Sequence, residues 1–68
     1  MSRDIVTLWN EGQWRCEIHT GGIPGQGSFL VYRGGDVVTA EAVPLGAMAY
    51  ARSEILRQRV LRGDMQAA

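Results

Sequence analysis

Residues 45–62, LGAMAYARSEILRQRVLR, decide the fold, because they predict one amphipathic helix at the end of a chain that otherwise reads as short extended segments. At about 100° per residue, the apolar side chains of this stretch fall within one half of the helix circumference. They are Leu45, Met48, Ala49, Ala51, Ile55, Leu56 and Val60. Pro44 suits the first turn of a helix, and Gly63 suits the left-handed position after the last turn. The sequence therefore predicts a helix whose apolar stripe covers a small sheet.

Two arginines interrupt this predicted stripe. Arg52 and Arg59 lie near its centre, whereas Glu54 and Arg57 lie on the far side, as charges on a packing helix should. We expect the aliphatic stems of Arg52 and Arg59 to pack along the stripe, with their guanidinium groups at its rim or paired with an acid. The alternative is that they cross a subunit boundary or bind an anionic ligand, because a guanidinium binds carboxylate or phosphate through two bonds.

Four segments before the helix are rich in β-branched and aromatic residues, which predicts strands at about residues 5–9, 14–20, 28–33 and 37–43. Turn residues between them predict two hairpins, around Glu11-Gly12 and around Gly34-Gly35. Residues 1–4 and 65–68 are expected to lie outside these elements. The predicted fold is α+β: a four-stranded antiparallel meander of two β-hairpins, followed by one C-terminal helix packed on one face (ββββα), in a single domain spanning residues 1–68.

The predicted turns also imply a register. Side chains directly opposed in an antiparallel pair share a face. The expected helix-facing pairs are Trp9 with Trp14, Thr7 with Cys16, Ile5 with Ile18, Val31 with Val38 and Phe29 with Ala40. The opposite face then carries an apolar patch of Val6, Leu8, Leu30, Tyr32 and Val37, larger than a soluble monomer usually exposes. We expect this patch to meet a second copy of the chain or another protein, unless the register differs.

Chain length favours self-association. A 68-residue chain buries only about 60% of the surface that it exposes when unfolded, so its core is marginal. Cys16 is the only cysteine, which excludes an intrachain disulfide, and one cysteine with one histidine cannot close a structural zinc site. Association of two copies is the remaining common source of stability. The sequence therefore predicts a homodimer without a metal or cofactor.

No catalytic set is apparent. Cys16 and His19 are three residues apart on one predicted strand, so they point to opposite faces and cannot act together as nucleophile and base. Cys16 is expected in the core and His19 at the surface. Glu17 and Glu41 are expected to solvate the outer face of the sheet. The first hypothesis is therefore a non-catalytic accessory or interaction module.

Two other functions stay open. A single-stranded nucleic-acid binder would use the helix arginines Arg52, Arg57, Arg59 and Arg62, with Tyr32 and Trp9 or Trp14 as stacking surfaces. The element order resembles the subunit plan of small single-strand-binding coactivator-type proteins, although no motif accompanies the resemblance. A net charge of zero argues against a dedicated nucleic-acid binder. The third hypothesis is a small anionic ligand at the glycine-rich loop 20–27 beside His19.

Composition also suggests a location. The chain begins with MSRD, has no apolar segment typical of a signal peptide and has no apolar run long enough to span a bilayer. We therefore expect a soluble cytoplasmic protein with no membrane partner. All seven basic residues are arginines, which is typical of proteins from GC-rich bacterial genomes.

Overall fold

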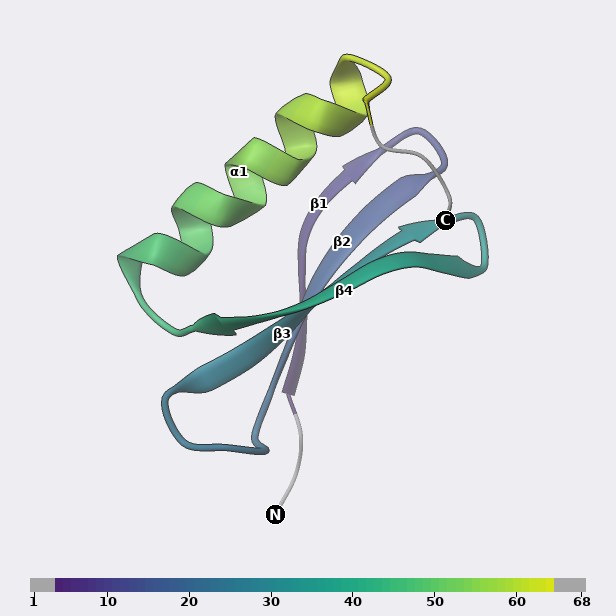
Figure 1. The fold of residues 1–68 in the computed structure, drawn as a ribbon. Helices are drawn as coiled ribbons and strands as arrows, with labels where there is room; N and C mark the ends of the chain where they lie inside the picture. The colour runs from purple at the N-terminus through teal and green to yellow at the C-terminus, as the bar shows by residue number, and fades with distance from the viewer. Residues whose placement is uncertain (1–3, 65–68) are drawn as a thin grey trace.

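The computed structural model describes residues 4–64, which form an antiparallel sheet and one helix. The strands are β1 (Asp4–Glu11), β2 (Trp14–Thr20), β3 (Gln26–Arg33) and β4 (Asp36–Pro44), and the helix is α1 (Ala47–Leu61). Strand order in the sheet is β1-β2-β3-β4, so β1 and β4 are its two open edges. Figure 1 shows α1 lying on one face of the sheet. The predicted ββββα fold class is confirmed.

Element boundaries differ little from the prediction. Asp4 already belongs to β1, and the helix begins at Ala47, because Gly46 with φ 133° precedes it. The predictions for residues 1–3 and 65–68 fall outside the described residues. The differences that matter concern the register between strands.

The first hairpin turns one residue later than predicted, and its register changes again at a bulge. Glu11 is opposite Trp14, so the turn residues are Gly12 and Gln13, and Gly12 has φ 61°. Trp9 is therefore opposite Cys16. The register shifts between Thr7 and Trp9, where Leu8 is the extra residue of a bulge.

This shift corrects the predicted faces of β1. Beyond the bulge, Val6 is opposite Ile18, whose side chain belongs to the core, and Ile5 is opposite His19. Val6 therefore lies on the helix side of the sheet and Ile5 on the other side. The expected pair Trp9 with Trp14 is wrong because the turn lies one residue later, although both side chains do lie on the helix side. The expected pairs Thr7 with Cys16 and Ile5 with Ile18 are also wrong, because the bulge reverses the faces of Thr7 and Ile5.

The second hairpin contains a similar bulge. Tyr32 is opposite Val37, as predicted, but the register then shifts at Val38, so Val31 is opposite Thr39 and Phe29 is opposite Glu41. The expected pairs Val31 with Val38 and Phe29 with Ala40 are wrong. Glu41 consequently lies on the helix side. Its neighbours Ala40 and Ala42 lie on the outer face, not under the helix.

The core lies between the sheet and α1. Its buried side chains are Cys16, Ile18, Phe29, Val31, Val43, Ala49 and Leu56, with Leu8, Trp9 and Trp14 packed against them. Within α1 the buried residues are Ala49, Ser53 and Leu56, whereas Met48 is 73% exposed and Ile55 is 47% exposed. The helix is therefore rotated about its axis from the predicted orientation, and part of the predicted stripe faces outward.

Candidate functional site

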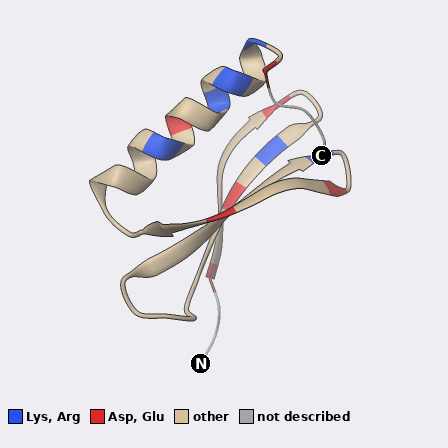
Figure 2. Ribbon diagram, viewed as in Figure 1, with Lys and Arg blue, Asp and Glu red and all other residues tan. Residues whose placement is uncertain are grey.

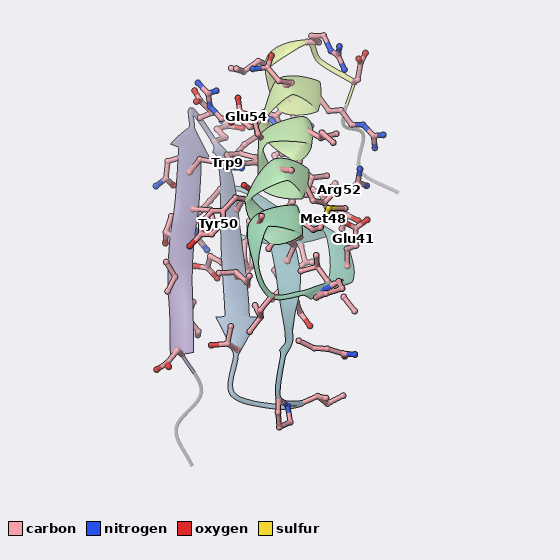
Figure 3. The ribbon with its side chains drawn as sticks, turned by 90° about the vertical axis from the view of Figure 1, so that its left-hand side faces the viewer. Trp9, Glu41, Met48, Tyr50, Arg52 and Glu54 are labelled. Atoms are coloured by element: carbon pink, nitrogen blue, oxygen red, sulfur yellow. The ribbon has the colours of Figure 1, made fainter. Side chains whose placement is uncertain are left out.

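The helix is held to β4 by an ion pair. Arg52 donates from Nε to Glu41 Oε2 over 2.8 Å and from Nη2 to Glu41 Oε1 over 2.9 Å. These hydrogen bonds are the main reason that the pKa of Glu41 is lowered and that of Arg52 raised. In Figure 3 the two side chains lie beside each other on the flank of α1 that also carries Met48. Arg52 therefore pairs with an acid, as its first interpretation expected.

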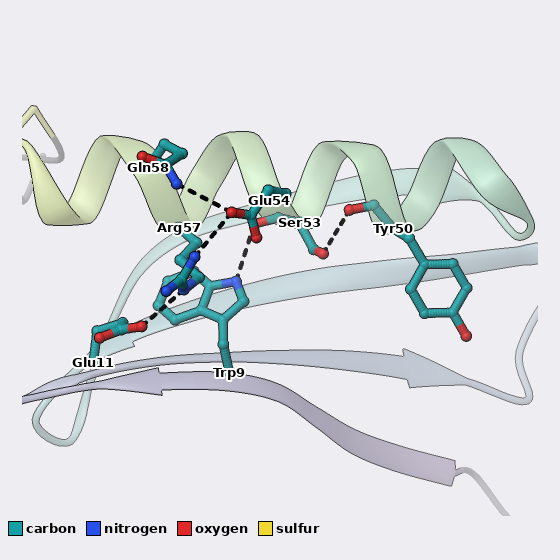
Figure 4. Close-up of polar contacts among 7 residues, drawn as sticks. All are labelled: Trp9, Glu11, Tyr50, Ser53, Glu54, Arg57 and Gln58. Atoms are coloured by element: carbon teal, nitrogen blue, oxygen red, sulfur yellow. Dashed lines mark hydrogen bonds and ion pairs between the residues drawn. The ribbon is translucent and has the colours of Figure 1, made fainter.

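A second set of polar contacts holds α1 to β1 (Figure 4). Arg57 donates from Nε to Glu11 Oε1 over 2.8 Å and from Nη1 to Glu54 Oε1 over 2.9 Å. Trp9 donates from Nε1 to the main-chain oxygen of Ser53 over 3.0 Å. These contacts use the Trp9 indole and the Arg57 guanidinium to fix the helix.

The four helix arginines do not form one free basic strip. Arg52 and Arg57 are paired with acids, Arg62 Nε lies 3.3 Å from Asp64 Oδ2, and Arg59 is exposed. Figure 2 shows acidic positions among the basic ones on α1 and on the strands. Trp9 is half-buried against the core and Tyr32 is on the opposite face of the sheet. The structure thus places Tyr32 on the face opposite the helix arginines, whereas Trp9 contacts the helix itself.

The predicted partner face divides into two surfaces. Leu30 and Tyr32 are half-buried on the outer face, and Val37, on the same face, is 52% exposed. Val6 and Leu8 instead lie on the helix side, because of the bulge in β1. The expectation that all five residues form one patch is wrong, whereas their role toward a partner stays a prediction.

An apolar groove occupies the helix side at the β1 edge. It measures about 330 Å³ and lies between the sheet and the start of α1, lined by Val6, Leu8, Ile18, Thr20, Leu45, Gly46, Ala49 and Tyr50. Tyr50 is 71% exposed, Val6 52% and Leu45 42%. We call the set Val6, Leu8, Leu45 and Tyr50 the β1 shelf. Tyr50 was not among the residues of the predicted apolar stripe, so sequence reasoning missed it.

A polar cluster occupies the middle of the outer face. Glu17 Oε1 accepts a hydrogen bond from His19 Nε2 over 3.1 Å, and Glu17 Oε2 lies 3.1 Å from Arg15 Nε. The guanidinium carbon of Arg15 lies 4.5 Å from the centre of the Tyr32 ring. The hydrogen bond from His19, the charge of Arg15 and a contact with Tyr32 together lower the pKa of Glu17. Glu17 therefore does more than solvate the sheet, since only 15% of its side chain is exposed.

A second hollow, of about 260 Å³, lies at the other end of this cluster. It is lined by His19, Thr20, Gly22, Ile23, Gln26, Gly27, Ser28 and Ala42. His19 and Ser28 are directly opposed across β2 and β3. His19 thus lines the same hollow as residues of the glycine-rich loop. Their closeness in the sequence had suggested this proximity.

Cys16 is a core residue. Its side chain is fully buried, and burial followed by the charge of Glu17 raises the pKa of the thiol to about 11. The thiolate needed for nucleophilic chemistry is therefore scarce near neutral pH. Cys16 also lies on the face opposite His19, as predicted.

Within residues 4–64, no group of three or more His, Cys, Asp or Glu side chains is placed to hold a metal ion. Over the same residues, no helix has the length and apolar composition needed to cross a bilayer.

Comparison with protein families, with curated proteins and with solved structures gave no match. Three surfaces of the described residues are candidates for a functional role: the β1 shelf, the polar cluster and the loop hollow.

Proposed function

We propose that this chain is a non-catalytic interaction module that works as a homodimer, and that two copies meet along the open edge of β1. The observation that carries the proposal is the unprotected character of this edge. Between Asp4 and Glu11, β1 has six uncharged residues, IVTLWN, without glycine or proline. A long, apolar and uncharged edge strand readily pairs with another strand.

The other edge of the sheet is protected. β4 ends at Pro44, carries a bulge at Val38 and directs the charged Glu41 toward the helix side. All three features oppose pairing at an edge. β1 also has a bulge, at Leu8, so the difference between the edges is made by Pro44 and Glu41 in β4. The contrast between the two edges favours β1 as the contact.

The β1 shelf supplies apolar surface beside this edge. Two β1 strands paired antiparallel about a two-fold axis perpendicular to the sheet would keep both helices on one side. The shelf of each copy would then face that of its partner. Tyr50, which Figure 3 shows over β1, and Val6 would lose their exposure to water. Such burial adds the stability that a chain of this size lacks.

The test is absolute mass in solution, measured by light scattering on a sizing column over a range of protein concentration. We expect the unmodified chain to be a dimer. Val6→Lys should give a folded monomer, because it places a charge in the shelf. Val37→Lys is the matched control, since Val37 is equally exposed, at 52%, but lies on the other edge strand.

Three results would overturn the proposal. The first is a monomer at every concentration. The second is a dimer that survives Val6→Lys but is lost in Val37→Lys. The third is a dimer that is lost in Leu30→Lys and retained in Val6→Lys, which would place the interface on the outer face. Circular dichroism of each variant distinguishes dissociation from unfolding.

A further inference from the structure

The hollow beside the glycine-rich loop lies on a different part of the molecule from the β1 shelf. Its floor is formed by Ser28 and Ala42, neighbours across β3 and β4 whose side chains are small. The lining also includes His19 from β2, Ile23 from the loop and Gln26 at the start of β3. At about 260 Å³ it has room for a small polar group and not for a large ligand.

The lining of the hollow is suited to negative charge. The hydroxyl group of Ser28 and the amide of Gln26 can donate hydrogen bonds. His19 is the one ionisable side chain in the lining, and no carboxylate is part of it. An oxyanion placed there would meet donors without meeting a like charge.

Glu17 fixes the orientation of His19. A carboxylate only accepts hydrogen bonds, so the contact of 3.1 Å between Glu17 Oε1 and His19 Nε2 requires the proton on Nε2. This contact leaves Nδ1 for another partner. When the ring is protonated on both nitrogens, Nδ1 becomes a charged donor.

The loop that closes the hollow is anchored at two points. The main-chain nitrogen of Gln26 donates to the oxygen of Ile23 over 3.1 Å, closing a turn through Pro24 and Gly25. The main-chain nitrogen of Leu45 donates to the oxygen of Gly25 over 2.9 Å, which ties the loop to the segment before α1. A site held in place before binding loses less entropy on binding.

We infer that this hollow binds a small oxyanion group, carboxylate or phosphate, through protonated His19 and the donors of Gln26 and Ser28. Glu17 acts as a positioning residue for His19. The inference does not depend on a dimer, since the lining belongs to one copy.

The charged surroundings of His19 determine the dependence on pH. Glu17 contacts its ring, Arg15 and Tyr32 lie behind Glu17, and Asp4 is opposite the adjacent Thr20. From β3 and β4 the nearest positions, Ser28 and Ala42, are uncharged. Binding needs a proton on both ring nitrogens of His19, so it should strengthen toward lower pH.

The experiment is an NMR titration of the full chain with sodium phosphate, and separately with sodium acetate, at pH 6 and pH 8 and constant ionic strength. We expect saturable shifts of the His19 ring and of the Gly22, Gln26 and Ser28 amides at pH 6. His19→Gln should weaken the affinity for phosphate about tenfold, since a charge-assisted hydrogen bond is lost. Glu17→Gln should also weaken it and reduce its dependence on pH.

The comparison of anions and variants decides the outcome. Phosphate and acetate distinguish the two sources of the oxyanion, and binding of either supports the site. Equal shifts with sodium chloride, or shifts unchanged in His19→Gln, would overturn the inference. Thr39→Gln is the control, because it adds an amide on the helix side of β4. If the chain proves to be a monomer, the titration still tests anion binding, because all lining residues belong to one copy.

Discussion

Gly27 has a structural role that its surroundings in the sequence conceal. It belongs to β3 and is buried, opposite Val43. A Cβ atom there would lie 2.9 Å from Leu45 Cδ2 and 3.2 Å from Ile18 Cδ1. Four glycines between residues 21 and 27 predicted a loop. They could not reveal that one of them lets Leu45 and Ile18 pack over the strand.

Substitution of Gly27 tests this role. Gly27→Ala should lower the free energy of unfolding by about 1 kcal/mol, because the new methyl group overlaps flexible side chains that can partly move away. Gly22→Ala is the matched control, since no atom lies within 4 Å of its Cβ position. Urea denaturation followed by tryptophan fluorescence gives both values. Equal losses in the two variants would show that close packing at Gly27 is unimportant.

Prediction at single positions succeeded where it required only the alternation within one strand. Cys16 and His19 fall on opposite faces of β2, as their spacing indicates. Glu17 and His19 share a face for the same reason, but the sequence does not show that they bond. The contact of Arg15 with Glu17 and the stacking of Arg15 on Tyr32 depend on rotamers and on a neighbouring strand.

Pairing between elements was less predictable. Both edge strands contain one extra residue, Leu8 in β1 and Val38 in β4, and each reverses the alternation beyond it. The turn residues predict where hairpins form, yet a bulge leaves no distinct composition. This reversal moved Val6 into the β1 shelf and Glu41 under the helix. The predicted outer patch was wrong for that reason.

The orientation of α1 follows from the register shift in β4, which puts Glu41 on the helix side. With Glu41 on the helix side, Arg52 can bond it, while Arg57 bonds Glu11 on the other flank. The strip between the two arginines, which includes Ala49, Ser53 and Leu56, is then buried. The prediction from apolar residues alone put the buried stripe on a different side of the helix, because it did not include the ion pairs of Arg52 and Arg57.

The ion pair of Arg52 and Glu41 predicts a response to acid. The pKa of Glu41 is lower in the folded chain than in the unfolded one, so its contribution is present above about pH 4.3 and is lost as pH falls through the folded value. Glu41→Gln should reduce stability at pH 7 by about 0.5–1 kcal/mol. The difference from the unmodified chain should shrink below pH 4.

Urea denaturation at pH 7 and pH 3 measures this difference. Asp36→Asn, at the exposed start of the same strand, is the control and should change stability little at either pH. If Glu41→Gln lost the same stability at pH 3 as at pH 7, the ionised carboxylate would not be the cause.

For the whole molecule, the order of elements could be predicted and the surfaces they leave open could not. Four strands and a helix follow from turn residues and from the change of periodicity at Pro44, which local sequence specifies. Whether a strand edge is open to pairing depends on where bulges, proline and charged side chains such as Glu41 lie. The contrast between the β1 and β4 edges therefore became visible only in the assembled sheet.

A homodimer joined at β1 predicts that thermal stability depends on concentration. Two folded copies dissociate as they unfold, so each tenfold rise in protein concentration stabilises the dimer by about 1.4 kcal/mol. For a dimer of this size the midpoint of thermal unfolding should rise by about 5 °C. Calorimetry over a hundredfold range of concentration measures the shift. Val6→Lys should abolish the dependence and Val37→Lys should keep it, whereas a midpoint independent of concentration in the unmodified chain would mean that β1 remains an open edge.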